Sequence, residues 1–146
     1  MRNCMVFIVF LILLCLSSSG KAEDLNKKVV GKWYNPYTYD SSGEMKGFWF
    51  KKNGKCKALG IKTLDLRTWE VKNGRLIIKG YSLTKDGKEW EDYETSERIE
   101  KVNSDSLYVI AAEKPFKMGF LYLTPKCLKK KVKPGSNHDV MIKEEE

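Results

Sequence analysis

Few residues in this chain could carry out catalysis, and their spacing does not suit it. The only histidine, His138, lies in a charged C-terminal segment that is expected to be a tail outside the fold, so no Ser-His-Asp triad is expected. The sequence has no Cys/His/Asp cluster at the spacing of metal ligands and no glycine-rich phosphate loop. The acidic stretch GKEWEDYETSE, 87–97, could supply a carboxylate pair for sugar hydrolysis, but an exposed strand with alternating charges explains it better. The sequence therefore predicts a protein that is not an enzyme and that needs no metal or cofactor.

Aromatic and polar residues on strand-like segments are better candidates for binding a ligand. Within 91–101, strand spacing places Tyr93, Thr95, Glu97 and Ile99 on one face. A carboxylate that points into an apolar interior is costly unless it is paired. Glu97 could therefore meet a ligand's polar group or an internal Arg or Lys, or the strand could bulge and leave it in solvent. The candidate ligand-binding residues are Phe48, Phe50, Trp69, Tyr93, Glu97, Tyr108 and Tyr122.

Short strands joined by tight turns must position these residues. Asn53-Gly54 and Asn73-Gly74 are strong hairpin signals, and Asp86-Gly87 is a third turn of the same chemistry. The segment 35–44, with Pro36, is expected to interrupt regular structure. We expect strands over 29–34, 45–52, 55–64, 66–72, 75–83, 91–101, 106–112 and 117–124.

Eight sequential strands predict an all-β fold. A meander of that length hides its edges best by closing into an antiparallel up-and-down barrel. The interior of such a barrel is wide enough for side chains or for one small ligand. If the many bulky aromatics fill it completely, the protein would instead be a solid-core module that binds a protein or glycan of the cell envelope.

The segment VVGKWYNPY, 29–37, places a glycine two residues before a tryptophan. We expect Gly31 to let the backbone pass close beneath a neighbouring element and Trp33 to plug the base of the barrel. Together with GFWFKKNGK, TLDLRTWEVKNGRLIIKGYSL and ERIEKVNSDSLYVI, this segment resembles the small bacterial lipocalin-like (calycin-type) proteins of the cell envelope, over roughly residues 29–124. The resemblance implies a barrel that binds a small hydrophobic or amphipathic molecule. Lipocalins often place a late arginine over this tryptophan, and Lys126 is the only nearby cation here.

The N-terminus has the features of an export signal. Arg2 precedes an apolar run over 5–16, and small residues lead to Ala22, after which we expect cleavage. The apolar run is shorter than the roughly 20 residues that a membrane-spanning helix needs. The alternative is lipid attachment at Cys15, although Leu14 is larger than the residue usually found before a lipidated cysteine. The prediction is an exported protein, periplasmic or extracellular, with an outer-membrane lipoprotein as the alternative.

The rest of the chain divides into a barrel domain over 23–128 and a charged, disordered tail over 129–146. The chain has 27 basic and 19 acidic residues, a net charge of +8. In an exported protein this charge favours solubility, acidic small molecules or anionic surfaces over nucleic acid. We expect a monomer that meets a membrane only if it is lipidated. Beyond the signal, Cys56 and Cys127 could form a disulfide or remain two separate buried thiols.

Overall fold

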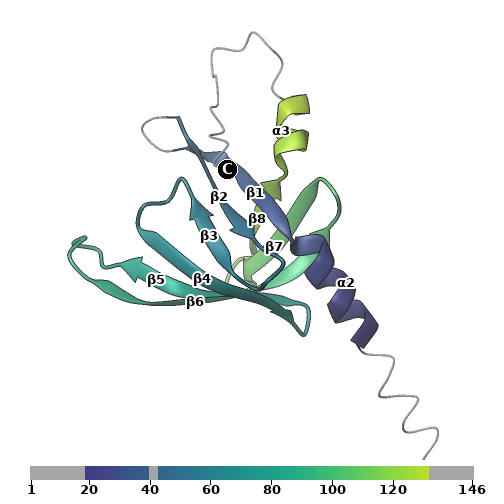
Figure 1. The fold of residues 1–146 in the computed structure, drawn as a ribbon, viewed down its shortest axis with the longest axis horizontal. Coiled ribbons are helices and arrows are strands. Elements are labelled where there is room, and N and C mark those ends of the chain that lie inside the picture. Colours follow the sequence, from purple (N-terminus) through teal and green to yellow (C-terminus); the bar gives the residue numbers. More distant parts are fainter. Residues whose placement is uncertain (1–18, 40–42, 132–146) are drawn as a thin grey trace, which may run out of the picture.

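The computed structural model describes residues 19–39 and 43–131, which form an eight-stranded antiparallel sheet with one short helix before it and one after it (Figure 1). Residues 1–18 of the predicted signal (1–22) and residues 132–146 of the predicted tail (129–146) lie outside the described residues. The elements in chain order are α2 (Ser19–Val29), β1 (Gly31–Tyr39), β2 (Met45–Phe50), β3 (Cys56–Leu59), β4 (Leu64–Lys72), β5 (Arg75–Leu83), β6 (Trp90–Val102), β7 (Ser106–Ala112), β8 (Met118–Leu123) and α3 (Pro125–Lys131).

The sheet curls into a nearly closed barrel. Its strand order is β3-β2-β1-β8-β7-β6-β5-β4, so the first and last strands pair and the two edges are the consecutive strands β3 and β4. A single bridge between Lys55 and Thr68 connects those edges, and the backbone N–H of Trp69 donates to the carbonyl of Gly54 over 2.9 Å. The prediction of an eight-stranded antiparallel barrel is confirmed for the described part of the chain, with the weak seam between β3 and β4.

The Asn-Gly turn between β4 and β5 forms as its chemistry predicts. Asn73 and Gly74 have φ angles of 52° and 70°, and the flanking Lys72 and Arg75 pair directly. A two-residue turn of this kind needs positive φ at both central positions, which asparagine and glycine tolerate. Because this turn fixes the register of a long hairpin, it also decides which β5 residues face the barrel interior.

A bulge in β4 changes which of its side chains point inward. Strict alternation would place Arg67 on the same face as Trp69 and Val71. The pairing with β5 shifts between Leu66 and Thr68, so Leu66 and Trp69 both belong to the core while Arg67 is exposed. A Cβ on Gly80, opposite this bulge, would lie 2.3 Å from the carbonyl oxygen of Asp65, so only glycine allows the two strands to approach so closely.

The first strand starts later and ends later than predicted. Val29 is the last residue of α2 and not part of a strand, and β1 continues through Pro36 to Tyr39. Pairing with β2 is regular up to Tyr34 and resumes at Tyr39, so the proline lies in an irregular stretch. There its missing N–H costs no ladder hydrogen bond, which is why it does not end the strand.

The helix α3 was not predicted, and it crosses the predicted boundary between residues 128 and 129. Its Leu128 packs with Tyr34, Met45 and Leu123 in a small apolar cluster outside the barrel. Figure 1 shows α3 lying beside β1 and β8. No helix among residues 19–39 and 43–131 is long and apolar enough to cross a membrane.

Candidate ligand-binding site

One end of the barrel is closed by α2 together with Trp33. Leu25, Val29 and Val30 pack against the interior core, and the side-chain oxygen of Asn26 accepts the backbone N–H of Val71 at 3.2 Å. Trp33 is only 2% exposed, and its indole N–H donates to the carbonyl of Val29 over 2.7 Å. That carbonyl belongs to the last residue of α2, whose C-terminal carbonyls have no partner within the helix. The tryptophan therefore caps the helix as well as filling the base.

The reason for the glycine before Trp33 differs from the one predicted. No atom lies within 4 Å of the position that a Cβ on Gly31 would occupy, so close approach does not require it. Its φ is +137°, a conformation that L side chains rarely adopt. Gly31 therefore supplies the backbone conformation that joins α2 to β1, and two residues later the Trp33 indole bonds to the Val29 carbonyl.

Four of the predicted aromatics form a continuous row across the barrel interior. We call Trp69, Phe50, Phe48 and Tyr122 the aromatic row. Its successive ring centroids are separated by 5.3 Å from Trp69 to Phe50, 6.0 Å from Phe50 to Phe48, and 5.5 Å from Phe48 to Tyr122. The indole N–H of Trp69 donates to the carbonyl of Lys51 over 2.9 Å and fixes that ring beside the β3–β4 seam. The row runs from β4 through β2 to β8.

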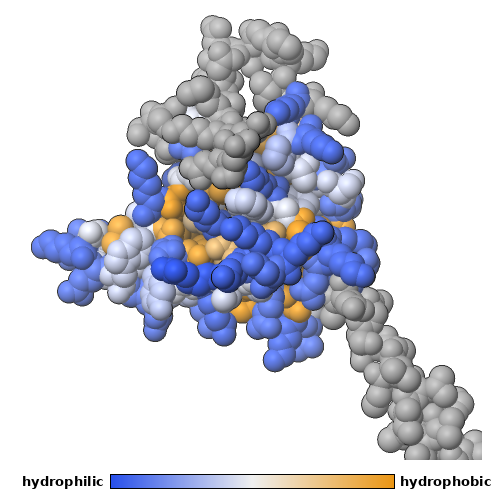
Figure 2. Space-filling view, viewed as in Figure 1, coloured by the Kyte–Doolittle hydropathy of each residue, from blue (hydrophilic) through white to orange (hydrophobic). Residues whose placement is uncertain are grey.

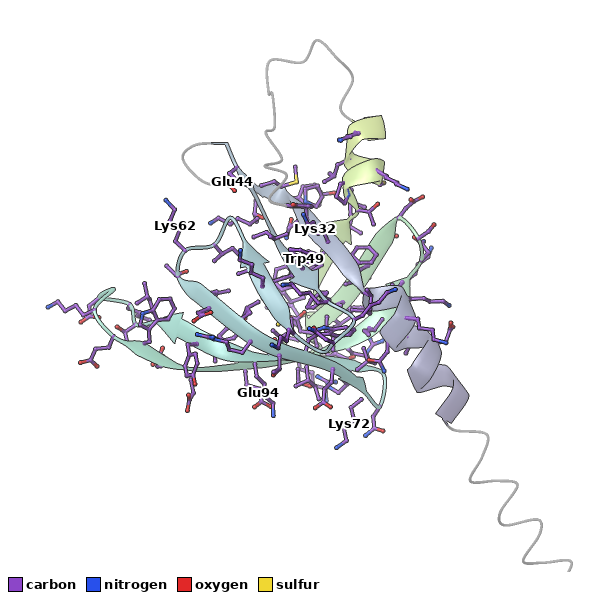
Figure 3. The ribbon with its side chains drawn as sticks, in the orientation of Figure 1. Lys32, Glu44, Trp49, Lys62, Lys72 and Glu94 are labelled. Carbon is purple, nitrogen blue, oxygen red and sulfur yellow. The ribbon has the colours of Figure 1, made fainter. Side chains whose placement is uncertain are left out.

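Figure 3 shows Lys32 and Trp49 beside one another on β1 and β2. The ammonium groups of Lys32 and Lys51 lie 4.7 and 4.6 Å from the Trp49 ring centroid. Trp49 alternates with Phe48 and Phe50, which belong to the interior core, so its ring faces outward. Alternation alone did not say which face of β2 was buried, and the structure assigns the phenylalanines to the interior.

Glu97 points into the barrel from β6. It pairs with Leu76, a core residue, and it shares its face of β6 with Tyr93 and Ile99, which also pack on the core. The bulge that could have turned it outward does occur in β6, but farther along, between Ile99 and Lys101. Burial raises the pKa of the Glu97 carboxyl, because the charged form is poorly solvated there. Among the described residues, no ion pair or hydrogen bond to this carboxyl is present.

Two tyrosines lie close enough to Glu97 for its charge to act on them. Burial and then the Glu97 carboxylate raise the pKa of Tyr122, which is at the end of the aromatic row. The same two causes raise the pKa of Tyr93, and the hydroxyl of Thr95 offsets a small part of that rise. The Thr95 hydroxyl is nevertheless fully buried without a hydrogen bond of acceptable geometry within the described chain. This orphaned hydroxyl is a feature that the sequence analysis did not single out.

Tyr108 does not belong to this site, contrary to the prediction. Its neighbours Leu107 and Val109 are buried in the interior core, so alternation along β7 turns Tyr108 to the outer face. There its hydroxyl oxygen lies 2.2 Å from the position that a Cβ on Gly119 would occupy. The predicted set therefore separates into six residues that face the interior and one that does not.

The two cysteines are free thiols, so the disulfide considered from the sequence is absent. Cys56 begins β3 inside the barrel core, whereas Cys127 lies in α3 against the apolar cluster on the outside. The wall of the barrel separates them, which is the physical reason that they do not bond. Burial raises the pKa of the Cys56 thiol to about 11.

The end of the barrel opposite α2 carries exposed aromatics. In an up-and-down meander the β1–β2, β5–β6 and β7–β8 connections all lie at this end, and Figure 1 shows the β5–β6 hairpin projecting away from α2. Trp90 begins β6 and is 51% exposed, and Phe116, between β7 and β8, is 82% exposed. Figure 2 shows apolar surface surrounded by hydrophilic side chains on this view of the molecule. We call this end the open end.

A groove of about 820 Å³ lies at the closed end, between α2, β1 and the start of α3. Its charged lining residues are Lys27, Lys28, Lys32 and Lys126. Lys28 is paired with Asp24 at 2.8 Å. In the described ranges, no three His, Cys, Asp or Glu side chains gather in a way that could hold a metal ion.

Comparison with known proteins agrees with this geometry. The family model described as lipocalin-like matches residues 25–124, which is more than half of the chain. A crystal structure of a lipocalin-like protein from Bacteroides thetaiotaomicron is similar, with a TM-score of 0.52 and 19% identity, and the match covers 64% of this chain and 94% of that one. A search of the curated proteins found no match. From the family match and the shared barrel, the chain belongs to the lipocalin-like family.

Proposed function

We propose that this protein is a binder, not an enzyme, and that it holds a small amphipathic molecule inside its barrel. The observation that carries the proposal is that the same barrel interior contains the aromatic row and an inward carboxyl with no protein partner in the described chain. Ligand sites in proteins are typically apolar surfaces with a few convergent polar groups. The aromatic row supplies the apolar surface, and Glu97, Thr95, Tyr93 and Tyr122 supply the polar groups.

The accessibility of the inward side chains supports a ligand lying along β6. The inward residues Leu107 and Val109 of β7 are buried, whereas Tyr93, Glu97 and Phe48 are only half-buried although they face the interior. Solvent therefore reaches this side of the interior. We propose that the ligand enters at the open end, where the exposed aromatics offer a first apolar contact.

Binding is tested by titrating tryptophan fluorescence with fatty acids, haem-like compounds and isoprenoids. Trp69 lies in the aromatic row, so a bound ligand should change its emission, and the change should disappear in Trp69→Phe. The matched control is Trp49→Phe, which removes an indole from the outer face and should leave the response unchanged. If no compound changes the emission and hydrogen exchange shows a fully protected interior, the barrel is solid and the proposal is wrong.

We further propose that the protein is exported as a monomer to the periplasm or the exterior, after cleavage behind Ala22. The features that support this are Arg2, the apolar run over 5–16 and the small residues before Ala22. Intact mass spectrometry of the protein from its native cell measures the N-terminus directly. A mass that starts at Glu23 supports the proposal, whereas a lipid-modified chain that starts at Cys15 would assign it to the membrane surface.

A second candidate function rests on the groove at the closed end. Four lysines line it, and the groove carries no acidic lining residue. Such a surface is complementary to an anionic glycan of the cell envelope. Binding to an acidic polysaccharide should weaken steeply with salt and should fall in the double variant Lys27→Ala with Lys126→Ala. Lys79→Ala, on the barrel wall and paired with Glu94, is the control.

A further inference from the structure

We infer that the barrel selects a ligand whose buried end carries a protonated amine, and that Glu97 is the group that pairs with it. The inference rests on the proposed function, because it assigns a chemical class to the ligand of that same interior site. Three independent features of the described chain support it: the charge inside the barrel, the hydrogen-bonding groups around Glu97, and the aromatic row that leads to it.

The charge around Glu97 is negative and uncompensated. By strand alternation, Lys46 and Glu91 are the other charged residues of the described strands that share the inward face, and each lies near the start of its strand at the open end. Glu97 lies in the second half of β6, toward the closed end. No basic group offsets the effect of burial on its pKa. A carboxylate ligand with its head at this depth would face a like charge, whereas an ammonium group would supply the missing counter-ion.

All the polar groups near Glu97 can accept a hydrogen bond, and the ionised carboxylate is the one that cannot donate. A carboxylate only accepts, and the buried Thr95 hydroxyl on the same strand face has no well-formed hydrogen bond within the described part of the chain. The hydroxyl oxygens of Tyr93 and Tyr122 lie within reach of the Glu97 charge and can also accept. An ammonium group has three N–H donors and no acceptor, so it would satisfy several of these groups at once. A bare hydrocarbon end would leave the Glu97 carboxylate and the Thr95 hydroxyl without a partner among the described residues, at the cost of unpaired polar groups.

The aromatic row extends this preference to the rest of the ligand. The Glu97 charge acts on Tyr122, which is the last ring of the aromatic row, and three more rings continue from Tyr122 across the interior. Aromatic faces attract organic cations, and the attraction grows when the cation is removed from water. The same rings accommodate an alkyl chain. The interior therefore fits an amphipathic amine better than a fatty acid or an alcohol of equal length.

The experiment compares decylamine, decanol and decanoate by isothermal titration calorimetry, each below its micelle concentration. The proteins are the wild type, Glu97→Gln and the control Glu94→Gln. Glu94 is an exposed acid on the same strand, paired with Lys79 at 3.6 Å, and it points away from the barrel in Figure 3. The control therefore removes the same charge from the outer face of the barrel.

We expect the wild type to bind decylamine at least about tenfold more tightly than decanoate, with decanol between them. Glu97→Gln should lose at least about tenfold in affinity for decylamine and should keep its affinity for decanol, which also shows that the variant is folded. Glu94→Gln should match the wild type.

Equal or tighter binding of decanoate by the wild type would overturn the inference even if the variant did not fold. So would an unchanged decylamine affinity in Glu97→Gln. If either result is obtained while at least one of the three compounds binds, the proposed function stands and only the amine preference is wrong. Binding of none of the three compounds would instead count against the proposed function itself.

Discussion

Replacing Trp33 with phenylalanine should separate the two roles of this residue, because the phenyl ring still fills much of the base but cannot donate a hydrogen bond. The indole N–H donates to the Val29 carbonyl over 2.7 Å in a buried setting. Losing it leaves that carbonyl unpaired, which costs about 1–3 kcal/mol. The smaller ring also removes roughly two carbon-sized groups from the core, at about 0.8 kcal/mol each.

We therefore expect the free energy of unfolding to fall by about 3–5 kcal/mol, a large part of the 5–15 kcal/mol typical of a domain. For a domain of about 100 residues this corresponds to a drop in melting temperature of roughly 10–25 °C. Urea unfolding followed by circular dichroism measures the change through the midpoint at constant slope. Hydrogen exchange should show the largest loss of protection in α2, whose last carbonyl has lost its partner.

The matched control is Trp49→Phe on the outer face, where the phenyl ring still offers an aromatic face to Lys32 and Lys51. Its unfolding free energy should change by less than about 0.5 kcal/mol. A loss of under about 1 kcal/mol in Trp33→Phe, with unchanged protection of α2, would refute the idea that this hydrogen bond holds the helix across the barrel base.

The remaining predictions concern the interior and the thiols. Burial raises the pKa of Glu97 in the folded protein. Between the ordinary carboxyl pKa and this raised pKa, the folded protein therefore binds more protons than the unfolded chain. The free energy of unfolding consequently falls as the pH rises through that range. Glu97→Gln should therefore melt higher than the wild type at pH 7, and the gain should vanish near pH 4; an equal gain at both pH values would contradict this. Tyr122→Phe should weaken ligand binding by severalfold in calorimetry while Tyr108→Phe leaves it unchanged, and equal effects would mean that the outward placement of Tyr108 is wrong. In the folded protein an alkylating reagent should modify Cys127 before Cys56, whose burial raises its thiol pKa to about 11, and a reducing agent should not lower the melting temperature.

Glu97 also explains why the apo barrel can be less stable than a simple variant of itself. A carboxyl without a partner in an apolar interior costs free energy in the unliganded protein. Natural proteins accept such costs at sites where the group is needed for function. The pH dependence of the stability gain in Glu97→Gln and the preference for amines over carboxylates thus both measure the effect of the Glu97 charge, one on stability and the other on binding.

Local chemistry in the sequence was enough to predict the strands and most of the interior. The Asn73-Gly74 turn fixed a hairpin because both residues tolerate positive φ. Alternation along β6 correctly placed Tyr93 and Glu97 on one face, because that strand is regular until the bulge beyond Ile99. These features depend on neighbours in the chain, so they could be read without knowing the fold.

The tertiary structure decided what depends on contacts distant in the sequence. Arg67 turned outward because of a bulge opposite Gly80, and Tyr108 turned outward because Leu107 and Val109 were buried by strands far along the chain. Three further features depend on how the sheet curls. They are the weak seam between β3 and β4, the packing of the helices on the base and the outer wall, and the separation of the two thiols. By itself the sequence determined an antiparallel barrel with an acid on an inward face. Only the packed structure showed that this acid faces the same interior as the aromatic row and meets no cation among the described residues, because pairing and burial arise between strands and not within them.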